Sequence, residues 1–435
     1  MIIGGGIWSN WYGSVVCRPK KIVKPKDEVE LAAAVRCASG EVRAAGTGLS
    51  YSPLCETAGT IIDIAAFGGL TGFDSDKSVA TIGAGTPMWE IASLLHREGF
   101  GLETMGDNDR ETLSGAVAAG THGSGASLGS LSAEVAGFNL VQANGDVVHC
   151  DAQENPEIFA AGRQSLGLFG VMTEVGMKVR PRYKLVKSYF IHSIDETFRQ
   201  LDGMVAANRH FEFFWYPYND FILCRSLNET NARAPEPRSP SAMRARGERP
   251  SLKSFAVMAI NEVLPLAPFL LKPSHYLLAQ LRKSFGRVRW SNETFPSPHL
   301  VRFGEMEYAV PYEKGADVVR EIVEEVRKKK IVTGYPIIFR TVAADDIWLS
   351  PFYGRKSATI SVGQYRRQDA RVLFQTCEDI FRRYQGRPHW GKIHSMTAAE
   401  AARLYPKYED FRVLRSSLDP DGRFLNRHLR AILPE

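Results

Sequence analysis

Hydrophobic and polar positions follow two different patterns on either side of residue 184. Before it, short apolar runs such as 61–64 alternate with helical periodicity such as that of 27–37. After it, alternation rich in Tyr and Phe, as in 189–192 and 211–216, predicts antiparallel strands with one covered face. The patterning therefore predicts an α+β protein with a mixed first domain and a sheet-based second domain.

Composition narrows the class of protein further. The 435 residues are 44% hydrophobic and 23% charged, which excludes disordered, collagen-like and disulfide-scaffold proteins. The six cysteines are scattered without a Cys-x-x-Cys pair, so we expect reduced thiols and no metal site. A net charge of +6 is small for this length, and no nucleic-acid partner is predicted.

An unusual stretch interrupts the second domain. Residues 231–252 contain four prolines and five arginines, which predicts a mobile basic loop, and they lead into an apolar segment at 256–281. Two interpretations stay open: a solvated loop followed by a core helix, or a basic loop and an apolar helix resting on an anionic membrane surface. Pro265 and Pro268 interrupt the apolar segment, so no spanning helix is expected. The first residues lack a signal-peptide pattern, which favours a cytoplasmic protein, with the inner membrane surface as its alternative location.

The strongest chemical signals are four Gly-rich turns in the first domain, at 44–51, 82–86, 113–125 and 165–173. Glycine exposes backbone N–H groups without a Cβ in the way, which suits the oxygens of a pyrophosphate. A doubly wound dinucleotide-binding fold needs a helix to open on its glycines, but Gly46-Thr47-Gly48 runs into Leu-Ser-Tyr-Ser-Pro. The turns therefore predict a cofactor held by a different fold.

Together these motifs resemble the vanillyl-alcohol-oxidase type of flavoprotein and, within it, the sugar-lactone and alditol oxidases. The segments that carry the resemblance are 25–29, 46–51, 121–125, 165–173, 305–311, 340–351, 389–392 and 418–424. The resemblance implies a two-domain PCMH-like FAD-binding fold with an antiparallel-sheet substrate (cap) domain. It implies an FAD-binding domain at 1–183, a cap domain at 184–385 and a C-terminal segment at 386–435 that returns to the flavin interface.

The resemblance also implies which residues hold FAD. They are Ala45, Gly46, Thr47, Gly48, Leu49, Ser50, Tyr51, Gly115, Gly120, Thr121, His122, Ser124, Gly125, Gly170, Val171 and Lys392. In many relatives a histidine of the first loop is bonded covalently to the flavin. That position is Leu49 here, which has no nucleophilic nitrogen, so we expect noncovalent FAD. His122 is interpreted as a histidine hydrogen-bonded within its own loop.

Two cations match the catalytic positions of the family. Hydride transfer to flavin N5 leaves negative charge on the ring, and a fixed cation stabilises it. Lys392 matches the lysine that contacts flavin and substrate hydroxyl, and Arg340 matches the arginine of a Glu-x-Arg pair. The alternatives are a solvated lysine and a surface ion pair between Arg340 and Asp345 or Asp346.

Two departures from the family pattern leave the proton acceptor open. The glutamate of the Glu-x-Arg pair falls at Ile338, and the histidine of the next strand falls at Ser361. An isoleucine accepts no proton, so a bulkier or more apolar substrate becomes plausible. The replacement acceptors considered are Glu305, Glu307, Tyr365 and His389, and Glu305 and His389 join Lys392 and Arg340 in the predicted catalytic set.

The leading hypothesis is an FAD-dependent oxidoreductase that oxidises a secondary alcohol or lactol of a sugar, sugar lactone or polyol. One alternative is a membrane-surface oxidase of a lipid-linked sugar, similar to the polyprenyl-phosphoribose oxidases, with membrane contact through 231–281. A second alternative is a flavin-binding electron-transfer subunit without turnover. Oxygen, a quinone or a cytochrome is expected as electron acceptor.

Overall fold

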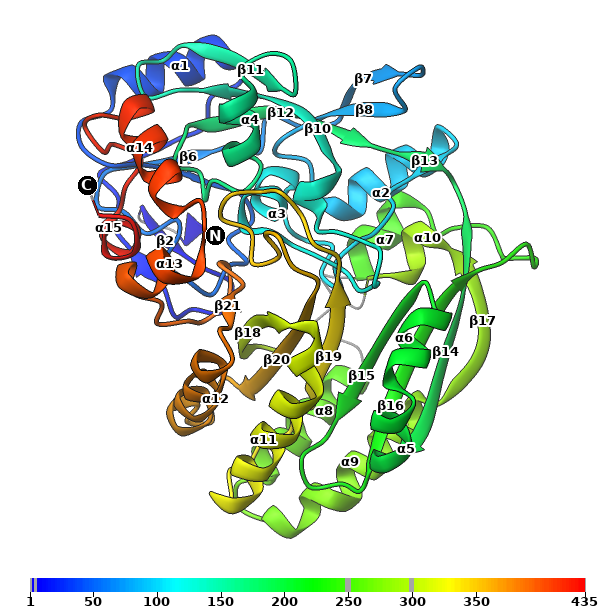
Figure 1. The fold of residues 1–435 in the computed structure, drawn as a ribbon. Coiled ribbons are helices and arrows are strands. Elements are labelled where there is room, and N and C mark those ends of the chain that lie inside the picture. The colour runs from blue at the N-terminus through cyan, green and yellow to red at the C-terminus, as the bar shows by residue number, and fades with distance from the viewer. Residues whose placement is uncertain (1, 4–5, 247–251, 297–300, 435) are drawn as a thin grey trace.

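The computed structural model describes residues 2–3, 6–246, 252–296 and 301–434. Its first 183 residues form the blue to green upper part of Figure 1, in which helices pack against several small sheets. One sheet is parallel, in the order β4-β6-β5, and a larger one is antiparallel, in the order β11-β10-β12-β8-β7. The strands of these two sheets are β4 (Lys21–Val23), β5 (Val42–Ala45), β6 (Thr60–Asp63), β7 (Leu70–Asp74), β8 (Val79–Gly83), β10 (Val135–Val141), β11 (Val147–Asp151) and β12 (Val171–Lys178).

Local sequence explains the helices of this domain. Helix α1 (Glu28–Cys37) begins where the Asp27 side chain accepts a hydrogen bond from the Glu30 backbone N–H, at 2.8 Å, and it buries Leu31 and Val35. The domain also contains α2 (Met88–Arg97), α3 (Leu113–Ala119), α4 (Pro156–Gly162) and a 3-10 turn η1 (Leu131–Glu134). Two small sheets join β1 (Ile2–Ile3), β2 (Ile7–Ser9) and β3 (Val16–Cys17), and β9 (Phe100–Gly101) with β13 (Arg180–Pro181).

The cap domain is built on one eight-stranded antiparallel sheet in the order β17-β14-β16-β15-β19-β20-β18-β21. This confirms the expected antiparallel sheet, and its first strand in chain order begins at Lys184. The strands are β14 (Lys184–Ser193), β15 (His210–Trp215), β16 (Phe221–Glu229), β17 (Ser284–Trp290), β18 (Phe303–Pro311), β19 (Ile337–Val342), β20 (Ser357–Tyr365) and β21 (Arg387–Pro388).

Alternation along these strands separates a core face from a polar face. Phe213, Phe339 and Ile360 belong to a core cluster that also contains residues of the covering helices. Those helices are α5 (Ile194–Arg199), α6 (Leu201–Ala207), α11 (Gly315–Lys328), which follows the turn η3 (Tyr312–Lys314), and α12 (Arg371–Arg383). The neighbouring positions, including Glu212 and Arg340, point the other way, because successive side chains of a strand alternate between its faces. That polar face is turned towards the N-terminal domain.

The C-terminal segment packs onto the N-terminal domain rather than onto the cap. In Figure 1 the red helices lie beside the blue ones. Phe411 and Leu429 share a core cluster with Leu31 and Ile62. The segment forms α13 (Ala398–Leu404), α14 (Tyr408–Leu418) and α15 (Arg427–Ile432). The chain ahead of these helices, at 389–392, is thereby placed between the two domains.

The predicted loop at 231–252 is wrong in part. Residues Pro240–Arg246 form helix α7, and Arg110 donates to the Met243 carbonyl at 2.6 Å. Residues 247–251 lie outside the described part of the chain. The apolar segment then forms α8 (Leu252–Val263), a 3-10 turn η2 (Pro268–Leu270) and α9 (Leu271–Arg282), so its prolines break the helix as expected. A short α10 (Ser291–Thr294) follows β17.

No helix among the described residues is both long enough and apolar enough to cross a membrane.

Candidate active site

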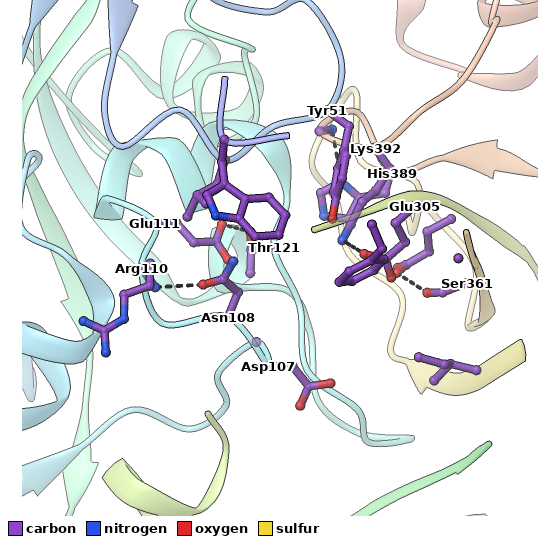
Figure 2. Close-up of a pocket in the computed structure, with 18 of the residues that line it drawn as sticks. Tyr51, Asp107, Asn108, Arg110, Glu111, Thr121, Glu305, Ser361, His389 and Lys392 are labelled. Atoms are coloured by element: carbon purple, nitrogen blue, oxygen red, sulfur yellow. Dashed lines mark hydrogen bonds and ion pairs between the residues drawn. The ribbon is translucent and has the colours of Figure 1, made fainter. Parts of the chain in front are cut away.

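A cavity of about 1380 Å³ lies between the polar face of the cap sheet and the N-terminal domain. Pockets for drug-sized ligands measure roughly 300–1,000 Å³, so this one has room for a large cofactor together with a small substrate. The N-terminal domain contributes the loop 46–51 and the segment 106–122, and the cap contributes β18, β19 and β20. Figure 2 shows both groups, with Lys392, His389 and Glu305 on one side and Asn108, Arg110 and Glu111 on the other.

The loop at 46–51 forms a cradle of backbone donors. It follows β5 directly, and the Tyr51 N–H donates to the Gly391 carbonyl at 2.7 Å, which ties the loop to the C-terminal segment. Among the described residues, the backbone N–H groups of 47–50 have no protein acceptor. Free N–H groups on a glycine-rich loop that lines a cavity are the donors that a pyrophosphate needs. These residues fit FAD.

The cradle depends on close packing at Gly46. A Cβ built there would lie 2.1 Å from Thr112 Oγ1, at the start of α3. We expect Gly46→Ala to push the loop away from α3 and to weaken flavin binding by about five- to a hundredfold, which lowers the amount of flavin that purifies with the protein, because one overpacked contact costs about 1–3 kcal/mol. The absorbance ratio of flavin to protein measures this.

The control for this prediction is Gly203→Ala. A Cβ at Gly203, in α6, meets nothing within 4 Å, so its flavin content should equal that of the wild type. Thr112→Ala in the Gly46→Ala background should restore part of the flavin. Full flavin content in Gly46→Ala would show that FAD is held elsewhere.

Lys392 and Glu305 form an ion pair at the wall of the cavity. The backbone sets it up, because His389 donates to the Glu307 carbonyl and Ile393 to the Glu305 carbonyl, both at 2.9 Å, so the segment lies along β18. The Lys392 ammonium also lies 5.3 Å from the centre of the Tyr51 ring. Lys392 bonds to Oε2 of Glu305, and no protein group is described on Oε1. One carboxylate oxygen is therefore left for a ligand.

Glu307 is held on every side by partners from three segments. His122 Nε2 and Ser361 Oγ each donate to it at 2.5 Å, and Arg340 Nη1 lies 4.0 Å away. His122 Nδ1 faces the Gly123 carbonyl at 2.9 Å, so both ring nitrogens of His122 face oxygen atoms. Ser361 lies between Ile338 and Glu307 in the sheet register. Glu307 thus supplies a polar group on the same cavity wall on which Ile338 is apolar.

Arg340 takes part in a four-membered charge cluster. Its Nε donates to Glu212 at 2.7 Å, and it also pairs with Asp107. Arg225 pairs with the same two carboxylates, at 3.0 Å from Asp107. The surface pair with Asp346 considered for Arg340 is wrong, since Asp346 pairs with Arg163 instead, at 2.8 Å. Because Asp107 belongs to the N-terminal domain, the cluster joins the two domains beside the cavity.

The charges around the cavity keep Lys392 and Glu307 ionised in spite of their burial, whereas His389 is neutral. Desolvation alone would lower the pKa of Lys392, but the carboxylates of Glu305 and Glu307 raise it. Desolvation would raise the pKa of Glu307, and the imidazole of His122 instead brings it well below its usual range. Burial lowers the pKa of His389 to about 3, so its ring is neutral. Its Nδ1 accepts from the Gly391 N–H at 3.1 Å, which places the proton on Nε2 and makes His389 a donor.

Most of the predicted residues come together. The predicted members that line the cavity are Gly46, Thr47, Gly48, Leu49, Ser50, Tyr51, Gly115, Thr121, His122, Glu305, Arg340, His389 and Lys392. Lys392 is not the solvated lysine of the alternative interpretation, and His122 bonds beyond its own loop. The predicted members outside the lining are Ala45, Gly120, Ser124, Gly125, Gly170 and Val171. Their role towards FAD stays a prediction.

Sequence reasoning missed the segment 106–112. Asp107 and Asn108 line the cavity, and Glu111 accepts from Thr121 Oγ1 at 2.7 Å while burial raises its pKa. A run of charged residues between a glycine and a helix start was the available signal.

Tyr365, considered as a proton acceptor, donates to Glu262 at 2.7 Å and lies outside the lining. No cluster of metal-ligating side chains exists in the described ranges.

Comparisons with known proteins agree with this geometry. The model of D-arabinono-1,4-lactone oxidase matches residues 175–432, and that of an FAD binding domain matches 19–151. An L-gulono-1,4-lactone dehydrogenase of Mycobacterium tuberculosis is 34% identical over 98% of this chain and 99% of its own. An alditol oxidase of Streptomyces is 26% identical over 98% of each chain. The solved structure of cholesterol oxidase from Brevibacterium sterolicum superimposes with a TM-score of 0.81 at 18% identity, covering 99% of this chain and 97% of the other, which shows the fold.

The donor cradle, the buried ion pair and the two-domain fold define an FAD-dependent oxidoreductase with a PCMH-type FAD-binding domain. Within that class the chain belongs to the D-arabinono-1,4-lactone oxidase family.

Proposed function

We propose that this protein oxidises a secondary hydroxyl of a sugar lactone, with FAD as the hydride acceptor. The observation that carries the proposal is the Lys392–Glu305 ion pair at the cavity wall, beside the free donors of the 47–50 loop. The dehydrogenase of M. tuberculosis and the L-gulonolactone oxidase of Mus musculus, 27% identical over 98% of each chain, are named for such lactones. This function is favoured over that of an electron-transfer subunit without turnover, because the site contains a cation, Lys392, and a proton acceptor, Glu305.

Each side chain has a role that its contacts support. FAD, when bound, supplies a ring that accepts the hydride of the carbinol C–H. Lys392 holds a positive charge where negative charge develops, in a pocket with little water. Glu305 accepts the hydroxyl proton on Oε1, the oxygen that Lys392 leaves open. His389 donates from Nε2 and orients a substrate oxygen. Arg340 and Glu307 are positioning residues that keep the wall polar.

The mode of FAD binding, the electron acceptor and the location belong to the same proposal. Leu49 lines the cavity at the position of the family's attached histidine and offers no nucleophile, which supports noncovalent FAD. Oxygen, a quinone or a cytochrome takes the electrons. The protein works in the cytoplasm, at the inner membrane surface if residues 231–281 contact lipid.

An anaerobic substrate panel tests the function. One sample of the purified protein is precipitated with acid to test how FAD is bound, and we expect the flavin in the supernatant. The native protein is then mixed without oxygen with gulono-, galactono- and arabinono-1,4-lactones, with alditols and with aldoses. We expect a 1,4-lactone to bleach the flavin absorbance fastest, because its carbinol is the class that the relatives' names indicate.

One variant and two alternative outcomes make this test decisive. Glu305→Gln should keep its flavin and reduce it more slowly than the wild type, whereas equal rates would place the chemistry elsewhere. An alditol that reduces the flavin while no lactone does would replace the proposed substrate class. Folded protein that binds no flavin at all would refute the proposal.

A further inference from the structure

Large apolar side chains gather on the outside of α8, η2 and α9. Of the fifteen large hydrophobic residues that are exposed in the described chain, nine lie between 255 and 285. They are Phe255, Val263, Leu266, Phe269, Leu270, Tyr276, Leu277, Leu281 and Phe285, and Leu266 and Phe269 are 86% and 79% exposed. We call these nine residues the α8–α9 surface. Exposed apolar patches of this kind mark binding sites in soluble folds.

The helix α9 is apolar on two faces. Leu271, His275 and Ala279 are buried, one turn apart, and Ala279 packs with Phe214 and Leu223 of the cap sheet. On the opposite side, where an ordinary surface helix carries charge, the helix presents residues of the α8–α9 surface. In Figure 1, α9 runs along the bottom of the molecule, with no other labelled helix below it. The outer face therefore lacks a cover in the described chain.

The segments that carry this surface are rich in basic residues. Residues 252–290 contain one acid, Glu262, and six basic residues, which are Lys253, Lys272, Arg282, Lys283, Arg287 and Arg289. Glu262 is already engaged by Tyr365 and Arg367. Arg282 and Arg287 are exposed and have no acidic partner in the ranges that the structure describes. Exposed apolar side chains with Arg282 and Arg287 nearby in the chain match an anionic lipid surface, whose headgroups attract the cations while its acyl region takes the apolar groups.

The charge also decides against a second copy of this chain as the occupant. A two-fold dimer through this surface would place the same patch against itself, so the exposed Arg282 and Arg287 would meet the same cations of the second copy. An anionic bilayer meets the same cations with the opposite charge.

The surface is continuous with the mouth of the cavity. The cavity lining includes residues of α8, α9 and β17 and of the link between the last two. They are Val257, Leu281, Arg282, Lys283, Ser284 and Arg287. A protein seated on lipid through α9 would hold this mouth at the membrane interface. A lipid-borne substrate or a quinone would then enter the cavity without crossing water.

We propose that the α8–α9 surface docks the protein on an anionic lipid bilayer and turns the cavity mouth towards it. This specifies the lipid contact named under the proposed function, but it does not depend on the reaction, because docking can be scored whether or not a sugar reduces the flavin. The Arg-rich stretch 231–246 is not needed for it, since its helix α7 packs against α2 of the N-terminal domain.

Vesicle flotation of the full chain with bound flavin tests the proposal. The vesicles contain phosphatidylcholine alone or phosphatidylcholine mixed with phosphatidylglycerol. We expect the protein to float with the anionic vesicles and not with the neutral ones, and to be released by high salt. The variant Leu266→Ser/Phe269→Ser/Leu277→Ser should lower the vesicle-bound fraction by more than about tenfold, because three exposed apolar groups are lost.

The control variant changes three equally exposed apolar residues elsewhere, as Val29→Ser/Val372→Ser/Val413→Ser, and should float like the wild type. Unchanged flavin absorbance shows that both variants are folded. Analytical ultracentrifugation of the same samples follows the oligomeric state. The proposal is overturned if the wild type floats with neither vesicle, if the α8–α9 variant floats as well as the wild type, or if that variant turns a dimer into a monomer.

Discussion

Replacing Lys392 with methionine should slow flavin reduction by about 10²–10³, the loss seen when one preorganised charged or hydrogen-bonding group is removed from an active site. Methionine keeps the length of the side chain and removes its charge. The change also leaves the Glu305 carboxylate buried without its cation. The rate constant is read by anaerobic stopped-flow bleaching of the flavin with the fastest lactone of the panel.

Two matched variants separate charge from packing. Lys392→Arg keeps the positive charge and should lose less than Lys392→Met, although its planar group does not fit a site built for an ammonium. Lys407→Met removes an exposed lysine that pairs with Asp410 and should reduce at the wild-type rate. If Lys392→Met stayed within about threefold of the wild type, Lys392 would have no part in stabilising charge during the reaction.

Acid should destabilise this protein steeply between about pH 6.5 and pH 4. Burial lowers the pKa of five histidines, to about 3 for His210, His389 and His394 and to about 4 for His275 and His428. Since an unfolded histidine titrates near 6.5, the unfolded chain binds more protons than the folded protein in this window, and the free energy of unfolding falls as pH falls.

The size of this effect follows from proton counting. Each extra proton on the unfolded chain lowers the free energy of unfolding by ~1.4 kcal/mol per pH unit. Asp345 acts in the opposite direction, because burial raises its pKa to about 6 and the folded state holds its proton. The net slope is on the order of 5 kcal/mol per pH unit near pH 5. Urea unfolding of the flavin-bound protein at several pH values measures it.

His275 offers a specific check on this slope. Its ring is fully buried, lies 4.6 Å from that of Tyr216 and finds no hydrogen-bond partner for either nitrogen among the residues that the structure describes. His275→Phe should make the slope shallower by ~1.4 kcal/mol per pH unit. His149→Phe, on the exposed side of β11, should leave it unchanged. Stability that is flat between pH 6.5 and pH 4.5 would contradict the prediction.

The sequence by itself determined the class of protein and much of the fold. Strand and helix periods, the Tyr/Phe alternation after Lys184 and the Gly-rich turns are local signals, because side-chain spacing follows directly from backbone geometry. The residue types also limited the chemistry. Lys392, after His389-Trp390-Gly391, can hold a positive charge, whereas the side chain of Leu49 cannot form a covalent bond to flavin. The break of the apolar segment at Pro265 and Pro268 was readable for the same reason.

Only the tertiary structure decided which groups share the site. The departure at Ile338 left the acceptor open, and only the sheet register places Glu307 beside Ser361, with Glu305 two residues away on the same face. Asp107 became an interdomain partner of Arg340 through a contact between residues 233 positions apart. The outer face of α9 likewise depends on which of its two apolar sides packs on the sheet. Such pairings are set by packing between distant segments, and spacing along one chain does not contain them.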